Sequence, residues 1–191
     1  MRSPNRSTRR AFLWLIIAVA LSIVAVGRWT VPLATWLMPI FLLRFVRQQP
    51  VWRGYVLAAL GVTLAGFVSW KGQIPFSGAA FYGFVLVTSF IGVLPYLADR
   101  LLVPRLSGLA ATLVFPTAVT TLEYLMSFGD YGTWGAVAYT QQNLSLLQLT
   151  TVTGIWGIAF VIHWTASVVA TAWAANVGWP RLRRPVIACA G

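Results

Sequence analysis

The chain has 191 residues, of which 59% are hydrophobic and only 9% are charged. Soluble domains carry about 25% charged residues, so this composition excludes a water-soluble fold and predicts an all-α integral membrane protein. The 14 Lys and Arg against 3 Asp and Glu give a net charge of +11. In a soluble protein this excess would favour nucleic acid, but the basic residues stand in short clusters between apolar runs, so we expect no nucleic-acid partner.

A basic tail at 1–10 precedes a multispan membrane domain at 11–191. We expect the tail to be disordered. We also expect the first span to be retained rather than cleaved as a signal peptide. A straight helix needs about 20 residues to cross a bilayer, with about 17 as the short limit. The first two apolar runs are therefore marginal, and they predict either a tight helical hairpin or a partly immersed pair. The six predicted spans are 11–26, 30–46, 52–70, 79–98, 107–126 and 146–175.

The last apolar runs do not fit single straight crossings of the bilayer. At about 1.5 Å per residue, the run at 146–175 is roughly 45 Å long, too long for one perpendicular crossing. We expect an interfacial entry that bends near Gly154 and Gly157. Three arginines then precede a short apolar run from about 185. This run is interpreted as the start of an incomplete seventh span.

The basic residues assign an orientation to the predicted spans. With six alternating crossings, all of the 14 Lys and Arg except Arg28 and Lys71 fall on the side of the amino terminus. Lys and Arg are retained in the cytoplasm, so we predict a cytoplasmic amino terminus. The Gly-rich and aromatic loop at 127–143 then lies on the outer face.

The residues that often carry chemistry are few. Cys189 is the single cysteine, which excludes an internal disulfide and a cysteine metal cluster. His163 has no second His or carboxylate three or four residues away, so no metal site is predicted and a hydrogen-bonded packing role is favoured. Paired carboxylates, a phosphate-binding Gly loop and a Ser, His and Asp set are not recognisable. We therefore assign no catalytic residue and no cofactor.

The three acidic residues are interpreted separately. Asp99 precedes Arg100 at a span end, which predicts a solvated local ion pair. Asp130 lies in the Gly-rich loop, where Asp commonly stabilises turns. Glu123 falls within the last turns of the fifth span, where an ionisable group is costly and is a functional candidate by default. Pairing within the bundle is the alternative for Glu123.

One stretch, 115–164, resembles a known family. It contains LEYL around Glu123, GTWGAVAYTQ in the following loop, and LLQLTTVTGIWGIAF. These segments resemble the amino-terminal membrane domain of apolipoprotein N-acyltransferases. The chain departs from the family at Met126, where the family has a basic residue. The matching positions are Glu123, Trp134, Tyr139, Gln141, Gly154, Trp156, Gly157 and Phe160.

The resemblance implies a bacterial inner-membrane domain that holds two substrates. These are a phospholipid acyl donor and a lipoprotein that receives the acyl chain at its amino-terminal cysteine. In the family, a carbon-nitrogen hydrolase domain supplies a Glu, Lys and Cys triad, so we expect that domain as a separate or missing partner and no catalysis by this chain alone. The substrate-binding residues implied by the resemblance are Glu123, Trp134, Tyr139, Gln141 and Trp156.

Two other functions stay open at this stage. The intramembrane polar residues Glu123 and His163 are compatible with a small transporter or channel subunit. A non-catalytic membrane scaffold, whose loop at 127–143 docks a separate enzyme, is the second alternative.

Overall fold

The structure is a computed structural model that describes residues 4–175, and this part of the chain is helical, with connecting loops. Intrahelical hydrogen bonds satisfy the backbone in a solvent that offers no hydrogen bonds, and the apolar side chains suit contact with lipid. The elements in chain order are α1 (Pro4–Ala25), α2 (Pro32–Arg47), α3 (Val51–Ser69), α4 (Gly78–Gly92), α5 (Leu94–Leu102), η1 (Val103–Arg105), α6 (Gly108–Met126), η2 (Val137–Thr140), α7 (Leu144–Thr153) and α8 (Ile155–Ala175).

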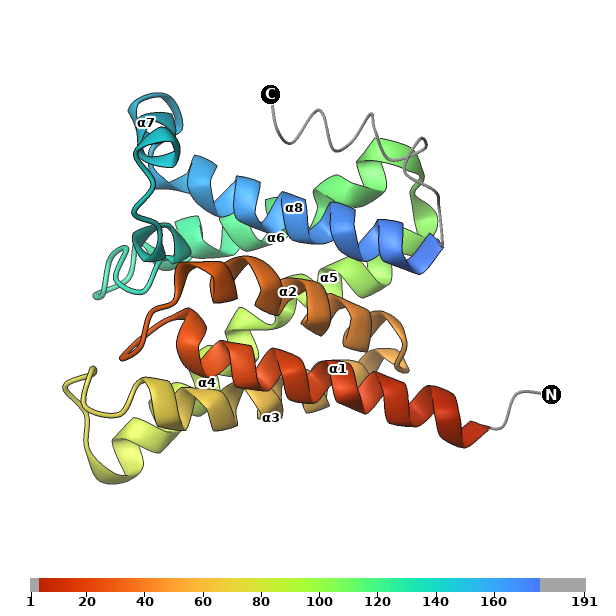
Figure 1. Ribbon diagram of the computed structural model, residues 1–191. Helices are drawn as coiled ribbons and strands as arrows, with labels where there is room; N and C mark the ends of the chain where they lie inside the picture. Colours follow the sequence, from red (N-terminus) through yellow and green to blue (C-terminus); the bar gives the residue numbers. More distant parts are fainter. Residues whose placement is uncertain (1–3, 176–191) are drawn as a thin grey trace.

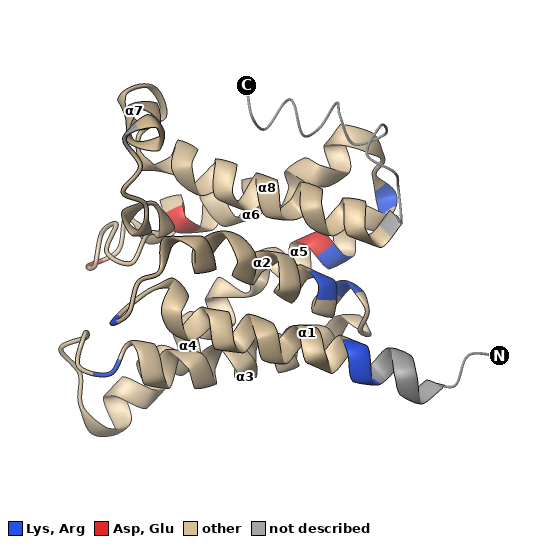
Figure 2. Ribbon diagram, viewed as in Figure 1, with Lys and Arg blue, Asp and Glu red and all other residues tan. Residues whose placement is uncertain are grey.

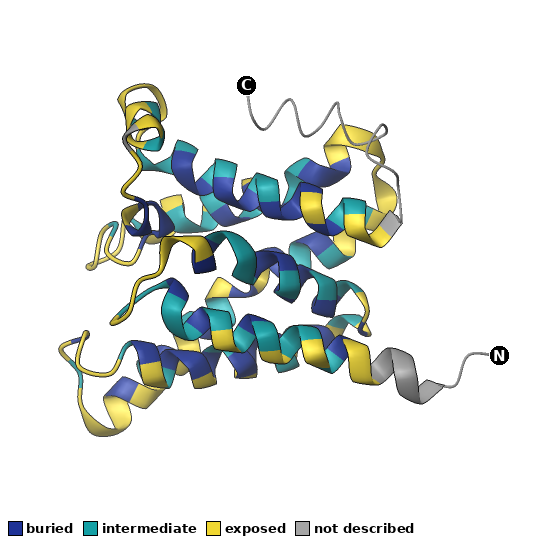
Figure 3. Ribbon diagram, viewed as in Figure 1, coloured by how far each residue is buried: buried dark blue, intermediate teal, exposed yellow. Residues whose placement is uncertain are grey.

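The long helices lie side by side along a common direction (Figure 1). α1 packs against α2 and α3, and α8 packs against α2 and α6. The buried core lies where these helices meet, and Figure 3 shows it as dark segments along α2 and α8. Its largest fully buried side chains include Leu42, Phe45, Phe115, Ile158 and Ile162.

Small residues allow α1 and α3 to approach closely. A β-carbon at Gly61 would lie 2.8 Å from Cγ2 of Val19, so a larger residue would force the side chains at this crossing to shift. In α8, Ala166 and Ala170 are fully buried, so small residues also form the contact face of this helix.

α1 and α2 form a tight hairpin, which is one of the two arrangements predicted for the first apolar runs. Gly27 at the turn has a φ of +90°, and a β-carbon there would lie 2.6 Å from the carbonyl oxygen of Ser69. The next amide, of Arg28, donates to that same oxygen at 3.0 Å. The hairpin turn is therefore docked on the end of α3, and glycine is required for the approach.

Four helical segments in the described residues are long and apolar enough to cross a bilayer. They correspond to the third to sixth predicted spans. α2 has 16 residues, or about 24 Å, which is short of the roughly 30 Å hydrocarbon core. The six-span count therefore stays a prediction. The four segments are Val51–Ser69, Gly78–Arg105, Gly108–Met126 and Ile155–Ala174.

Two predicted spans are interrupted. The fourth was expected to be continuous, but α4 ends at Gly92 and α5 begins at Leu94, because Pro95 has no amide hydrogen and its ring crowds the preceding turn. The expected bend in the sixth is confirmed at Gly154, which has a φ of +62° between α7 and α8. Gly157, in contrast, lies inside α8 and packs against Thr153.

The amino-terminal tail also differs from expectation. α1 begins at Pro4, so the segment 4–10 is helical rather than disordered. The predicted seventh span and Cys189 lie outside the described residues.

Charge separates the two ends of the bundle (Figure 2). Most described basic residues lie at the end that holds the start of α1, the last turn of α2 and the α5 to η1 segment; we call it the basic end. Arg28 and Lys71 lie at the opposite end, which also carries the loop before η2; we call it the loop end. The split read from the sequence is therefore a spatial separation along the helix direction.

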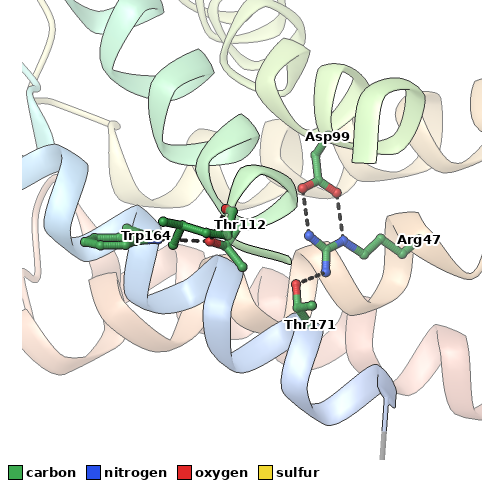
Figure 4. A network of polar contacts seen from close by, with 6 residues as sticks. Arg47, Asp99, Thr112, Trp164 and Thr171 are labelled. Carbon is green, nitrogen blue, oxygen red and sulfur yellow. Dashed lines mark hydrogen bonds and ion pairs between the residues drawn. The ribbon is translucent and has the colours of Figure 1, made fainter. Parts of the chain in front are cut away.

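Asp99 does not form the predicted solvated pair with Arg100. It is fully buried, and its two carboxylate oxygens accept from Nε and Nη2 of Arg47, each at 2.7 Å (Figure 4). Nη1 of Arg47 donates to Thr171 at 3.0 Å. The sequence neighbour was the wrong partner because the Asp99 side chain faces α2 and α8, so this bidentate pair joins α2, α5 and α8.

Asp99→Ala is expected to destabilise the bundle by about 3–5 kcal/mol, because it leaves the guanidinium of Arg47 without its carboxylate. Thermal unfolding in detergent measures this loss, and the readout is the fraction of protein that stays monodisperse after heating. Arg100→Gln is the control, since within residues 4–175 Arg100 donates only to the backbone oxygen of Gln49, at 3.3 Å. In the double variant Arg47→Met with Asp99→Leu, most of the stability should return; equal losses in the single and double variants would contradict the pairing.

Candidate functional site

A cavity of about 370 Å³ lies between α4 and α6. α4 packs mainly against α3, whereas α6 packs mainly against α8 and α5, so the facing sides of α4 and α6 do not fill the space between them. The loop at 129–137 covers the cavity at the loop end. Its walls are mostly aliphatic and aromatic, as in sites that hold apolar ligands.

The inner end of the cavity lies at the break between α4 and α5. Gly92, Val93, Pro95 and Tyr96 line it there, and Leu42 of α2 contributes from across the bundle. Along α3 the lining runs from Val62 to Trp70, which is about 12 Å at 1.5 Å per residue. The cavity is thus an elongated slot that follows the helix direction.

A smaller cavity of about 100 Å³ adjoins the slot between α1, α2 and α3. Ser89 and His163 line both cavities. The Nδ1 hydrogen of His163 donates to the carbonyl oxygen of Ala159 at 2.7 Å, and the ring packs edge-on against Phe115 at 5.5 Å. This geometry agrees with the hydrogen-bonded packing role expected from the sequence.

Glu123 lies in the last turn of α6, at the wall of the main cavity. Its Oε1 accepts from the backbone amide of Val137 at 3.3 Å, which ties the covering loop to α6. Its Oε2 is buried and has no hydrogen-bond partner within residues 4–175. Met126, at the position where the resembled family has a basic residue, also lines the cavity. The ionisable side chain is therefore only half satisfied by the protein.

Aromatic rings form the loop-end wall of the cavity. Trp134 packs on Trp70 with ring centroids 5.0 Å apart and lies 6.5 Å from Tyr131. Positive φ values at Gly132 (+55°) and Gly135 (+84°) allow the loop to turn sharply on both sides of Trp134. The loop thus presents its rings to the cavity.

Comparison with known proteins decides the family. The family model of the apolipoprotein N-acyltransferase N-terminal domain matches residues 17–168. The chain belongs to this family. A search of curated proteins and a search of solved structures found no significant match. The matched region extends from α1 into α8, so the cavity lies within the N-acyltransferase membrane domain.

The five residues predicted to bind substrate in this N-acyltransferase domain do not form one site. Glu123 and Trp134 line the main cavity. Tyr139 is 60% exposed, and its hydroxyl shares a hydrogen bond with Thr133, which does line the cavity, at 2.8 Å. Trp156 packs edge-on against Tyr124 of α6, with centroids 5.6 Å apart.

Gln141 does not line the main cavity, and its side chain makes hydrogen bonds that hold the loop. Its Oε1 accepts from Nε1 of Trp36 at 3.0 Å, and its Nε2 donates to Oγ1 of Thr140 at 2.7 Å. Thr35 donates to the same Thr140 oxygen at 3.2 Å. These buried bonds attach η2 to α2 and so hold the end of the covering loop.

The sequence interpretation missed several lining residues. Thr88 and Ser89 of α4 and Tyr131 of the loop line the cavity but were not singled out. Two adjacent hydroxyl residues in an otherwise apolar run were the available signal, since a bilayer-facing position would disfavour them. The signal is weak, because Thr88 can donate to its own helix, as it does to the Phe84 carbonyl at 2.8 Å.

Gln141→Ala is expected to loosen the covering loop, because the buried indole hydrogen of Trp36 loses its acceptor at a cost of about 1–3 kcal/mol. Hydrogen exchange of the amides at 129–141 measures the change, with faster exchange expected. Gln142→Ala is the matched control, as Gln142 is the adjacent residue of the same type and is exposed. Equal exchange in both variants would show that Gln141 does not hold the loop.

Proposed function

We propose that this membrane domain holds an acyl chain of a phospholipid in the slot between α4 and α6, for acyl transfer to the amino-terminal cysteine of a lipoprotein. The observation that carries the proposal is the elongated, largely apolar cavity inside a family member. Its volume of about 370 Å³ is in the range of pockets that bind small molecules, roughly 300–1,000 Å³. The slot also follows the direction in which bilayer lipids lie.

The energetics favour recognition at the loop end. An acyl chain that enters the slot leaves one apolar solvent for another, so burial alone contributes little, and packing and polar contacts decide the affinity. The polar and aromatic residues Glu123, Thr133 and Trp134 gather at that end of the slot. A lipid held with its chain toward Tyr96 would place its ester and headgroup beside them.

In this proposal the chemistry belongs to a carbon-nitrogen hydrolase domain, which is an additional part or partner. The described residues supply binding and orientation of the acyl donor. Tyr139 and Trp156, both at the loop end and outside the cavity lining, are proposed to contact the lipoprotein or the hydrolase domain. The domain by itself is not proposed to acylate anything.

A transporter is supported less well. Glu123 and His163 both line the main cavity, which is the observation in its favour. A transport path would have to continue to the basic end, but the inner end is lined by Leu42, Pro95 and Tyr96. Measurement of proton flux in liposomes tests this alternative, and flux that falls in Glu123→Gln would favour transport over acyl-chain binding.

We further propose that the basic end faces the cytoplasm and the loop end faces the outer side of a bacterial inner membrane. The charge separation between the two ends supports this orientation, since Lys and Arg are retained in the cytoplasm. The slot then takes lipid from the outer leaflet.

Gly92→Leu is expected to block the slot and to reduce bound phospholipid at least about tenfold, as counted by native mass spectrometry of the purified chain. Gly92 lines the cavity, and a β-carbon there would meet no described atom within 4 Å, so a leucine can be added at the cavity without a clash in its wall. Gly83→Leu is the matched control. It lies in the same helix with the same free space, but outside the cavity. Equal lipid retention by the two variants would refute acyl-chain binding in the slot.

Cysteine labelling in intact cells tests the orientation, after Cys189→Ser removes the native thiol. Lys71→Cys at the loop end should react with a membrane-impermeant maleimide. Arg105→Cys at the basic end should react only after the membrane is permeabilised. Both positions are exposed, so reactivity reports the side of the membrane. The reverse pattern would overturn the proposed orientation.

A further inference from the structure

Arg44, in the last turn of α2, carries a positive charge that no described carboxylate balances. Its guanidinium stacks on Trp173 of α8, whose ring packs against Trp14 of α1 and Phe41 of α2. We propose that these four residues form a binding site for the phosphate headgroup of an anionic phospholipid, on the surface of the bundle at the basic end. The site is separate from the slot between α4 and α6, and the inference does not depend on the proposed function.

The count of charges leaves Arg44 without a carboxylate. The sequence has three acidic residues. Asp99 is taken by Arg47, and Glu123 and Asp130 lie at the loop end (Figure 2). Arg44 and Arg47 stand together in the last turn of α2, so with Asp99 they keep one net positive charge. A charge beside hydrocarbon needs a counter-charge, and the phosphodiester of a lipid carries one negative charge.

The guanidinium of Arg44 has donors to offer. Among the described residues of the basic end, the arginines whose side chains donate hydrogen bonds are Arg47, Arg100 and Arg105. The Nε of Arg44 is buried and has no partner in the same part of the chain, but the residue as a whole is only half-buried, so a headgroup can reach its terminal nitrogens. A guanidinium presents its N–H donors in a planar fork that matches the oxygens of a phosphate.

The contact with Trp173 orients this fork without using its donors. The guanidinium carbon lies 4.8 Å from the centroid of the Trp173 ring, within the distance of a cation–π interaction. The ring therefore holds the guanidinium at the surface between α2 and α8. The N–H groups remain free for the oxygens of a ligand.

The aromatic rings favour a lipid over a soluble phosphate. Figure 1 shows α2 between α1 and α8, and the rings of Trp14, Phe41 and Trp173 form a continuous cluster across it, with centroids 5.0 to 6.0 Å apart. Trp173 is 40% exposed. Tryptophan rings suit the layer where headgroups meet hydrocarbon. A lipid whose phosphate binds Arg44 would rest its glycerol and first methylenes on these rings, whereas a soluble phosphate would use Arg44 alone.

The unbalanced charge makes the site selective for lipids with a net negative charge. Choline and glycerol headgroups carry the same phosphate, but the trimethylammonium of choline cancels its charge. Attraction of an anionic lipid to one basic residue near the bilayer surface corresponds to about a fivefold preference. We therefore expect phosphatidylglycerol to bind this site more tightly than phosphatidylcholine.

The test compares these two lipids, with identical acyl chains, on the full-length chain that carries Gly92→Leu. This background is expected to block the slot, so the lipid that remains, counted by native mass spectrometry, reports the surface site. Phosphatidylglycerol should bind about fivefold more tightly than phosphatidylcholine, and Arg44→Gln should remove most of this preference. Arg53→Gln is the matched control, because Arg53 also lies over an aromatic ring, that of Phe12 at 5.9 Å, and its loss changes the net charge equally. Its preference should stay near that of the background.

Three outcomes would overturn the site. The first is an unchanged preference in Arg44→Gln. The second is an equal loss in Arg44→Gln and Arg53→Gln, which would mean that the total charge of the basic end attracts the lipid. The third is displacement of the lipid by soluble glycerol phosphate at the same concentration as phosphatidylglycerol, since the rings would then contribute nothing. If Gly92→Leu retains as much lipid as its Gly83→Leu control, the proposed function fails, while the dependence of the preference on Arg44 is still measured.

Photocrosslinking of the unmodified chain tests the site if Arg44→Gln is not monodisperse. A phosphatidylglycerol analogue with a photoreactive group near its glycerol should label the segments that contain Trp14 and Trp173. An excess of phosphatidylglycerol should suppress this labelling more strongly than an excess of phosphatidylcholine. Labelling confined to other segments, or equal suppression by the two lipids, would refute the proposed site.

Discussion

The constraint on which this structure depends is the cost of charge inside hydrocarbon. The three acidic residues meet it in three ways. Asp99 is fully buried and takes two hydrogen bonds from Arg47, so its charge is balanced and three helices are joined. Asp130 stays exposed in the loop. In the described part of the chain, Glu123 accepts a hydrogen bond on one oxygen only, and it is the acidic residue that lines the cavity. The basic end therefore holds a buried ion pair that joins helices, and the loop end holds a carboxyl group that the described residues satisfy only in part.

Two apolar runs are broken rather than straight, and the first break lines the cavity. Pro95 ends α4 early and redirects α5 toward α2 and α6, so α4 keeps its packing with α3 but does not close against α6. Gly154 allows α7 to leave the line of α8. The covering loop is then tied down twice, by Glu123 at Val137 and by Gln141 at Trp36. The proposed binding of an acyl chain rests on this slot and its tethered cover.

The predicted site and the observed site overlap only in part. Glu123 was accessible to sequence reasoning because a carboxyl group in a span is unusual in itself, whereas Trp134 and Gln141 were singled out through the family resemblance. Gln141 serves to hold the loop, because its partner Trp36 comes from a helix more than a hundred residues earlier. Thr88 and Ser89 were missed, since a hydroxyl on a helix gives no sign of which neighbour it faces.

By itself, the sequence determined the helical class, the membrane environment, the separation of charge between two ends and the bend at Gly154. These properties follow from composition, run length and local backbone preference, which do not depend on which helices pack together. Only the tertiary structure decided that Asp99 pairs with Arg47 rather than with Arg100, that the fourth run breaks, and that α4 and α6 leave a slot between them. The physical reason is that partner choice and cavity shape depend on which helix faces face one another, and several small differences in packing decide that arrangement.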